Sequence, residues 1–115
     1  MTTYLAGPMT GFKNFNYANF NEAARRLVLA GLNVENPAGN TPPTCGTWMG
    51  YMRMAIMQMM TCDSVTVLPG WSESKGANIE VDLALALGIP VVLDHELLRD
   101  LLPELDAHPS AEVTG

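Results

Sequence analysis

Basic residues are scarce in this sequence. Six Lys and Arg stand against twelve Asp and Glu, which gives a formal net charge of −6 at pH 7. A protein that neutralises a run of phosphates on DNA or RNA needs a basic surface, which this composition does not supply. We therefore expect no polymeric nucleic acid as a partner. A single small anion is compatible with the composition, because backbone N–H groups at a helix start and one or two cations are enough to bind it.

Cysteine is also scarce, and long apolar runs are absent. The two cysteines, Cys45 and Cys62, lie far apart without a CxxC motif or a Cys/His cluster, so neither a zinc site nor a disulfide framework is indicated. No stretch approaches the roughly 18 consecutive apolar residues of a membrane span, and no basic segment followed by an apolar run opens the sequence. We expect a cytoplasmic protein with reduced thiols, no metal, no other cofactor and no membrane contact.

The size of the chain favours one domain. With 115 residues, of which 48% are apolar, it is long enough to bury a core. We place this domain at residues 1–103. The composition of the remaining residues, 104–115, is typical of a loose terminus or of a segment that docks on a neighbouring subunit.

Short apolar runs alternate with helical patterns along the chain. Strands are predicted at 3–6, 32–34, 64–68 and 89–93, and helices from 16, at 48–61, at 76–87 and after the last strand. Strands that alternate with helices imply right-handed crossovers and parallel pairing. The sequence therefore predicts an α/β, Rossmann-like (flavodoxin-like) three-layer α/β/α fold with a parallel sheet of four to five strands.

The predicted helices differ in how they distribute their apolar residues. The first carries Phe20, Ala23, Ala24, Leu27 and Val28 on one face, and the third carries Ile79, Leu83 and Leu87 along one side. The second is rich in methionine, which fills irregular gaps and usually indicates core packing or a subunit interface. Because a helix that is apolar on several faces needs a second partner to cover it, we expect a homo-oligomer.

Two loops are candidates for a ligand site, since parallel sheets bind ligands at the carboxyl ends of their strands. The first is the Gly-Pro-Met-Thr-Gly segment at 7–11, and the second is the segment at 69–80. The second supplies the hydroxyls of Ser72 and Ser74, the cation of Lys75 and the glycine Gly76 at a helix start, which suit an anionic group. An ordinary turn and N-cap would give the same pattern.

Glu80 lies among apolar neighbours in the third predicted helix rather than in a charged run. A carboxylate at the mouth of a parallel sheet can attack an anomeric carbon or stabilise an oxocarbenium-like centre. The alternative is a first-turn glutamate favoured by the helix dipole. The Tyr4 hydroxyl is expected to reach the pocket, where it could orient Glu80. The alternative is a core tyrosine whose hydroxyl has one hydrogen-bond partner. We expect Asp82 to face solvent and Asp63 to cap or pair at the start of a strand.

The motifs together resemble those of a known family. They read YLAGPMTG, NPA, WxxYMR, CDxVxxLPGWxxSxGAxxE and ALxLGIPVV. This combination resembles nucleoside 2-deoxyribosyltransferase-like proteins, in particular the small phage and bacterial DUF4406-type proteins, over residues 3–93. The wider superfamily includes nucleoside deoxyribosyltransferases and 2′-deoxynucleoside 5′-monophosphate N-glycosidases.

The resemblance implies roles for three residues. Glu80 matches the nucleophile that attacks the sugar, and Tyr4 matches the tyrosine that positions it. Ser74, six positions before Glu80, matches a serine that contacts phosphate in the monophosphate hydrolases, where transferases on free nucleosides tend to carry an aspartate. An aspartate would repel a phosphate dianion, whereas a hydroxyl donates a hydrogen bond to it.

The chain departs from the superfamily pattern at Ala55, eight residues before Asp63. Superfamily enzymes usually carry an aspartate there, which helps to handle the proton on the leaving base. Loss of a positioned acid or base typically costs about 10²–10⁴ in rate. Three alternatives stay open: a slow enzyme, an enzyme that uses another group, and a binding protein.

The leading hypothesis is an N-glycosidic bond enzyme that acts on 2′-deoxynucleoside 5′-monophosphates as a hydrolase or a deoxyribosyltransferase, with Glu80 as nucleophile. The alternatives are a nucleotide-binding or sequestering protein, and an interaction protein that uses the methionine-rich helix. The residues expected to bind the nucleotide or nucleoside are Gly7, Pro8, Met9, Gly11, Asn36, Trp48, Trp71, Ser72, Ser74, Lys75 and Gly76. Trp48 or Trp71 is expected to stack on the base.

Overall fold

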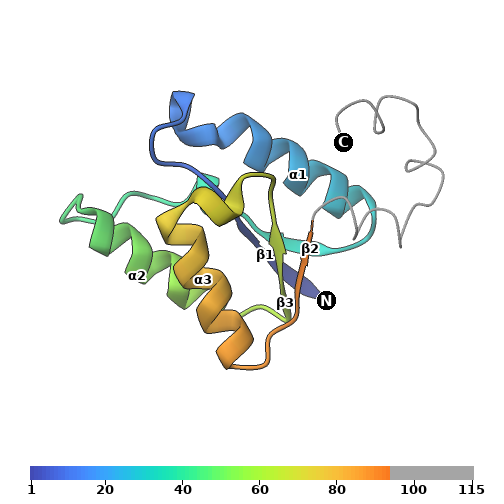
Figure 1. Cartoon of the computed structure of the whole chain (residues 1–115). Coiled ribbons are helices and arrows are strands. Elements are labelled where there is room, and N and C mark those ends of the chain that lie inside the picture. Colours follow the sequence, from blue (N-terminus) through green and yellow to red (C-terminus); the bar gives the residue numbers. More distant parts are fainter. Residues whose placement is uncertain (94–115) are drawn as a thin grey trace.

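The structure is a computed structural model that describes residues 1–93. Its centre is a four-stranded sheet in the order β2-β1-β3-β4 (Figure 1). The strands are β1 (Thr2–Ala6), β2 (Asn33–Glu35), β3 (Ser64–Val67) and β4 (Val91–Leu93). All three strand pairs are parallel. The predicted α/β, flavodoxin-like fold is confirmed, with four strands.

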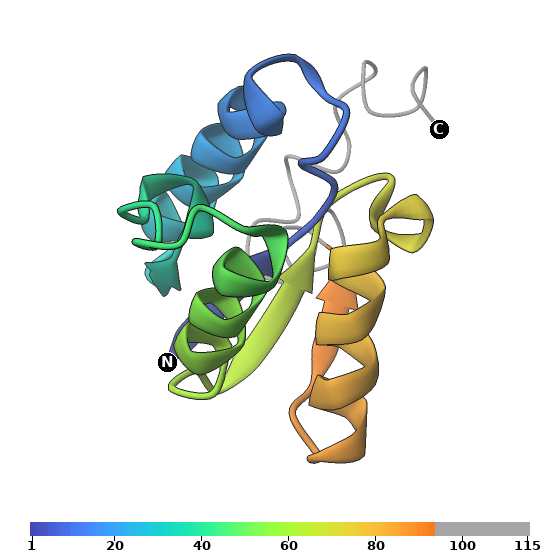
Figure 2. The same cartoon turned by 90° about the vertical axis from the view of Figure 1, so that its left-hand side faces the viewer.

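Three helices cover the sheet. They are α1 (Tyr17–Leu29), α2 (Trp48–Met59) and α3 (Lys75–Ala86), and short 3₁₀ helices η1 (Lys13–Asn16), η2 (Pro37–Gly39) and η3 (Trp71–Glu73) lie in the loops. The two views show α1 on one side of the sheet and α2 and α3 on the other (Figures 1 and 2). This arrangement gives the three layers that the sequence predicts.

Successive side chains of β1 pack into the cores on opposite faces of the sheet. Tyr4 and Ala6 belong to the core cluster formed with α2 and α3. Leu5, between them, belongs to the cluster formed with α1. Successive side chains of a strand point to opposite faces, so a central strand with helices on both sides is apolar throughout.

The buried faces of two helices differ from the apolar patterns in the sequence. In α1 Phe20 and Leu27 are buried, whereas Val28 is 56% exposed. On the predicted side of α3, Ile79 and Leu87 are exposed, whereas Leu83 is half-buried and packs against the core. The residues that α3 buries are Ala77, Glu80, Val81 and Ala84. Small side chains let this helix lie close to the sheet. Because one of the buried residues is a charged glutamate, the hydrophobicity pattern of the sequence does not indicate this side of the helix as the buried one.

The methionine-rich helix α2 is only partly packed into the core. Met59 is fully buried, whereas Met49 and Met57 are 62% and 72% exposed. Among the described residues no helix is long and apolar enough to cross a membrane. In the same part of the chain no cluster of His, Cys, Asp and Glu is suited to a metal ion. The helix predicted after β4 and the tail at 104–115 lie outside the described residues.

The first prediction concerns Gly7, which joins β1 to the loop that follows it. A Cβ at Gly7 would lie 2.9 Å from the Leu68 Cβ. We expect Gly7→Ala to push the ends of β1 and β3 apart and to cost roughly 1–3 kcal/mol of unfolding free energy, as overpacking does. Urea denaturation of the variant and of the original protein measures this loss of unfolding free energy. Gly39→Ala is the matched control, since a Cβ there meets nothing within 4 Å; equal stability of the two variants would contradict the prediction.

Candidate active site

A pocket with a volume of about 440 Å³ lies beyond the carboxyl ends of the strands. We call it the main pocket. Its floor includes Tyr4 of β1 and Glu80 of α3, and the loop after β1 contributes Met9 and Thr10. This is the edge of the sheet at which the loops after Ala6 and Leu68 were expected to hold a ligand.

Tyr4 and Glu80 form a buried pair at the base of the main pocket. The Tyr4 hydroxyl donates a hydrogen bond of 2.6 Å to Glu80 Oε2. Tyr4 is 1% exposed and Glu80 is 5% exposed. The expectation that the Tyr4 hydroxyl reaches Glu80 is therefore confirmed. The bond uses one carboxylate oxygen and leaves Oε1 for a ligand.

Burial controls the protonation of both members of the pair. It raises the pKa of Glu80 from the ordinary 4.5 to about 7, and the hydrogen bond from Tyr4 acts in the opposite direction. Burial, followed by the neighbouring Glu80 charge, raises the pKa of Tyr4 far above its ordinary value. Tyr4 therefore stays a donor, and Glu80 titrates close to neutral pH.

The helix dipole does not explain the position of Glu80. The N-cap of α3 is Ser74, and the first turn of the helix has no acidic residue. Glu80 thus lies beyond the turn in which the dipole acts. The other two candidate carboxylates lie elsewhere. Asp82 is exposed, and Asp63 accepts the Thr2 N–H at 2.9 Å at the opposite end of the sheet.

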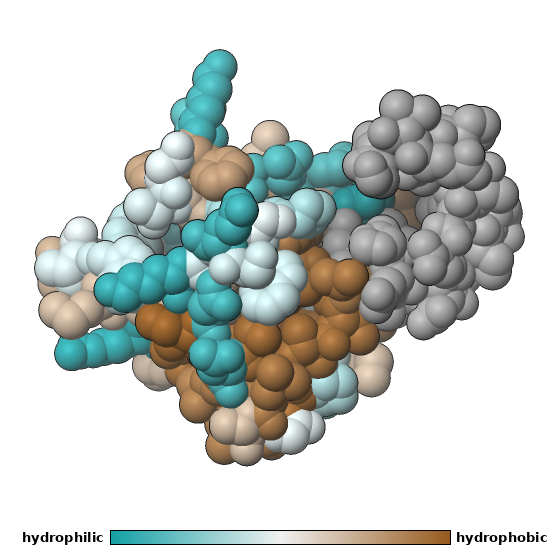
Figure 3. Space-filling model, viewed as in Figure 1, coloured by the Kyte–Doolittle hydropathy of each residue, from teal (hydrophilic) through white to brown (hydrophobic). Residues whose placement is uncertain are grey.

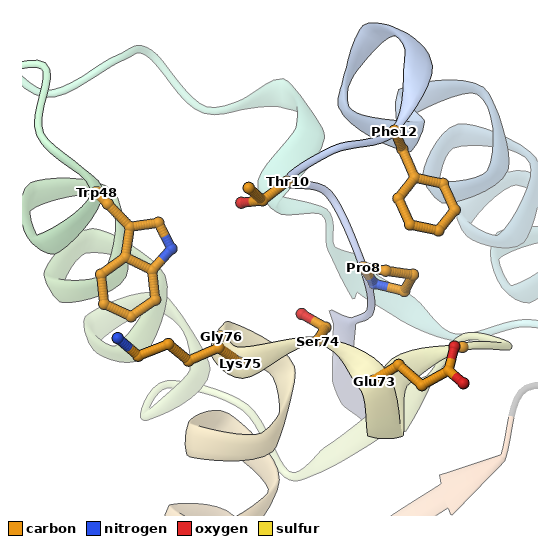
Figure 4. Close-up of a pocket in the computed structure, with 9 residues that line it drawn as sticks. Pro8, Thr10, Phe12, Trp48, Glu73, Ser74, Lys75 and Gly76 are labelled. Carbon is orange, nitrogen blue, oxygen red and sulfur yellow. The ribbon is translucent and has the colours of Figure 1, made fainter.

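A second pocket, of about 420 Å³, lies where α3 begins. We call it the loop pocket (Figure 4). It shares Thr10, Trp48, Ser74 and Gly76 with the main pocket, so the two adjoin. A Cβ at Gly76 would lie 3.0 Å from the Met52 sulfur, so the glycine lets the first turn of α3 lie close to the Met52 side chain of α2.

The loop pocket has one side suited to an anion. The Lys75 ammonium lies 4.7 Å from the centre of the Trp48 ring. Ser74 caps α3, and its Oγ accepts the Ala77 N–H at 3.2 Å. The backbone N–H groups of this helix start add a partial positive charge beside the Lys75 ammonium. Glu73 also lines the pocket but lies across it from Trp48 (Figure 4).

The structure brings together six of the predicted ligand residues and leaves five outside the pockets. Those that line a pocket are Pro8, Met9, Trp48, Ser74, Lys75 and Gly76. Gly7, Gly11, Asn36, Trp71 and Ser72 line neither.

Four of the five residues outside the pockets make structural contacts of their own, and the fifth, Gly11, has a positive φ of 86°. Gly7 is held against Leu68. Asn36 caps η2 by accepting the Ala38 N–H. Trp71 packs against the core beside α3, and the Ser72 carbonyl accepts the amide of Asn78.

Aromatic side chains of the main pocket were missed by the sequence analysis. They are Phe15, Tyr17, Phe20 and Tyr51. Three consecutive residues, Asn14 to Asn16, have φ of 49°, 54° and 64°, a left-handed conformation that asparagine tolerates better than most residues. The Asn16 amide donates to the Pro8 carbonyl at 2.9 Å and so ties this turn to the loop after β1. The two asparagines, Asn14 and Asn16, are the feature of the sequence that indicates a left-handed turn at this place.

A chain of amide hydrogen bonds holds the wall opposite β1. Asn40, which lines the main pocket, donates to Gln58 at 2.7 Å, and Gln58 donates to Glu35 at 2.9 Å. These bonds connect the loop before α2 to α2 and to the end of β2. Ala55 of α2 also lines this pocket.

The comparison with known proteins gives a family but no activity. No curated protein matches the chain. The family described as "Domain of unknown function (DUF4406)" matches residues 1–93, which are the residues of the described fold and of both pockets. The chain therefore belongs to the DUF4406 family.

Proposed function

We propose that this protein cleaves the N-glycosidic bond of 2′-deoxynucleoside 5′-monophosphates, either as a hydrolase or as a deoxyribosyltransferase. The observation that carries the proposal is the buried Tyr4–Glu80 pair at the base of a pocket that adjoins a cationic helix start. In this arrangement a nucleophilic carboxylate lies between a site for phosphate and an aromatic site for a base.

Glu80 supplies the nucleophile. Its free oxygen attacks C1′ of the sugar, the C1′–N bond breaks with its electron pair going to the base, and a glycosyl ester forms. Water then attacks C1′ and releases the carboxylate; in a transferase a second base takes the place of water. Tyr4 holds Oε2 throughout, which fixes the orientation of the carboxylate.

The loop pocket supplies the phosphate site. Lys75 offers a cation and the start of α3 offers backbone N–H groups, while the Ser74 hydroxyl lies between them and Thr10 (Figure 4). Charge-assisted hydrogen bonds to phosphate are about twice as strong as neutral ones. A 5′-monophosphate is therefore favoured over a free nucleoside.

A nucleotide-binding protein without turnover is the second candidate. Ala55 favours it, because its methyl group in the wall of the main pocket offers no proton donor or acceptor to a departing base. Such a protein would bind the same ligands through the same two pockets. It would bind a deoxynucleotide without releasing free base.

We also propose that the protein is a homo-oligomer. Three large apolar side chains in or directly after α3, those of Ile79, Leu85 and Leu87, are 39%, 61% and 57% exposed. Apolar residues gather over the lower half of the molecule in Figure 3, where α3 lies. Apolar surface of this kind is commonly covered by another subunit.

The second prediction tests the nucleophile. Glu80→Gln keeps the size of the side chain and an acceptor for Tyr4 but removes the nucleophile, so we expect base release to fall on the order of 10³-fold or more. Chromatography of free base from a panel of deoxynucleosides and their 5′-monophosphates measures it. Asp82→Asn is the matched control, because Asp82 is an exposed acid on the same helix. Undiminished base release in Glu80→Gln would contradict the proposal.

The third prediction concerns pH. Because Glu80 must be ionised to attack and its pKa is raised to about 7, kcat/KM should rise with pH through this value and level off above it. In Tyr4→Phe the hydrogen bond that lowers the pKa is lost, so the midpoint of the profile should move to higher pH. Tyr17→Phe, which changes a pocket tyrosine without a bond to Glu80, should leave it unmoved. Identical midpoints in all three proteins would exclude the assigned role of Tyr4.

The fourth prediction concerns the phosphate site. Lys75→Gln should raise KM for 5′-monophosphates roughly tenfold, the value of one charge-assisted hydrogen bond, and should leave KM for free nucleosides nearly unchanged. Steady-state kinetics on matched nucleoside and nucleotide pairs measure the difference. Lys13→Gln is the control, since Lys13 is an exposed lysine that lines neither pocket. Equal losses on nucleosides and nucleotides would argue against a phosphate contact.

A further inference from the structure

The wall of the main pocket carries almost no charge. Among the described side chains that line it, Glu80 is the only ionisable acid or base other than tyrosine phenols. The remaining polar side-chain groups are hydroxyls, the indole N–H of Trp48 and the amide of Asn40, whose nitrogen already donates to Gln58. Apart from Glu80, which the proposed reaction uses as the ionised nucleophile, no described carboxyl, imidazole or ammonium lines this wall to protonate a departing base.

The same wall is rich in aromatic rings that are exposed. Phe15 and Tyr17 come from the η1 and α1 side of the pocket, and Trp48 and Tyr51 come from α2. Phe15, Trp48 and Tyr51 are 57%, 39% and 45% exposed. Large aromatic side chains exposed together around a pocket indicate a ligand that covers them.

Aromatic faces attract cations, and the structure holds one example. The Lys75 ammonium lies over the Trp48 ring at 4.7 Å. Rings arranged around a pocket bind cationic ligands through the negative charge of their faces, with the largest effect where water is excluded. The main pocket combines such rings with a single carboxylate, Glu80, and with no described positive side chain of its own.

We propose that the preferred substrate is a 2′-deoxynucleotide whose base is already a cation, as in a purine alkylated at N7. This inference rests on the proposed function and identifies the class of base that the aromatic wall accepts. An alkylated purine would lie between the rings of Phe15 and Tyr51, with its sugar at Glu80 and its phosphate at Lys75, whose ammonium already lies over Trp48.

A cationic base removes the need for a proton donor. Glu80 attacks C1′, the C1′–N9 bond breaks, and its electron pair neutralises the positive ring, so the base leaves as a neutral molecule without taking up a proton. Water then attacks C1′, the ester bond to Glu80 breaks, and the proton of the water passes to solvent. An unmodified purine would leave as an anion and would need a proton at that moment.

The fifth prediction compares 7-methyl-2′-deoxyguanosine 5′-monophosphate with 2′-deoxyguanosine 5′-monophosphate. Because the methylated nucleotide is labile by itself, the quantity compared is the enzymatic kcat/KM divided by the spontaneous rate of each nucleotide, with Glu80→Gln as the blank. We expect this enhancement to be at least as large for the methylated nucleotide as for the parent, and its KM to be at least tenfold lower.

Variants of Tyr51 test the aromatic wall. Tyr51→Leu should raise KM for the methylated nucleotide about fivefold, in line with one cation–π contact, and should change KM for the parent less. Tyr51→Phe keeps the ring and should restore the value of the unmodified protein. A KM that responds equally on both nucleotides would indicate plain apolar packing and would overturn the assignment.

The outcomes separate this inference from the function on which it rests. Release of base from neither nucleotide above the Glu80→Gln blank overturns the proposed function. Release from both, with an enhancement a hundredfold greater for the unmethylated parent, leaves the proposed function in place and overturns the cationic substrate, because only a proton donor produces that advantage.

Discussion

The hydrogen bond between the Tyr4 hydroxyl and the Glu80 carboxylate joins the central strand of the sheet to α3. Its formation requires α3 to lie close to β1, and the alanines on the buried side of α3 allow this approach. A folded-state pKa above the ordinary value means that the folded protein binds more protons than the unfolded chain between about pH 4.5 and 7. Glu80 therefore costs stability as the pH rises through this range. A residue that weakens the fold when it is ionised needs another reason to be there, and the proposed role of Glu80 as nucleophile supplies one.

The rest of the site depends on how the loops around this pair are fixed. The turn at Asn14 to Asn16 is held in a left-handed conformation and is tied to Pro8, which brings Phe15 to the pocket. On the other side, the bonds from Asn40 through Gln58 to Glu35 hold the loop before α2. Left-handed residues other than glycine persist where the surrounding contacts determine them, often beside a ligand site. The pocket is thus built from ordered loops on a rigid sheet.

Much of the fold follows from the sequence, because the strands have strong signals. The run at 64–68 is rich in β-branched residues, and it forms β3, which like β1 has a neighbouring strand on both sides. The apolar side of α3 was harder to predict. The predicted stripe leaves Ile79 and Leu87 exposed and packs only Leu83 against the core, because the smaller residues of the helix lie more closely on the sheet.

The sequence predicted those site residues whose identity and place in the topology indicate their role. It predicted less well the residues whose orientation depends on tertiary packing. The contact between Tyr4 and Glu80, 76 residues apart, was expected from their places in the topology and from the family resemblance. Trp71 and Ser72 were expected at the ligand because they lie in the loop after β3. The 3₁₀ turn η3 instead directs Trp71 to the core and leaves Ser72 in solvent. Nothing in the local sequence distinguishes Trp71 from Trp48 in this respect.

The four residues shared by the two pockets make them thermodynamically dependent on each other. In the proposed binding mode, a phosphate in the loop pocket contacts Thr10, Trp48, Ser74 and Gly76, which also form part of the wall of the main pocket. Side chains that the phosphate holds in one rotamer would not lose that freedom a second time when a base binds. By reciprocity, each half of a nucleotide would strengthen the binding of the other by the same factor. A free base and inorganic phosphate, added together as separate molecules, should therefore bind cooperatively, without any bond between them.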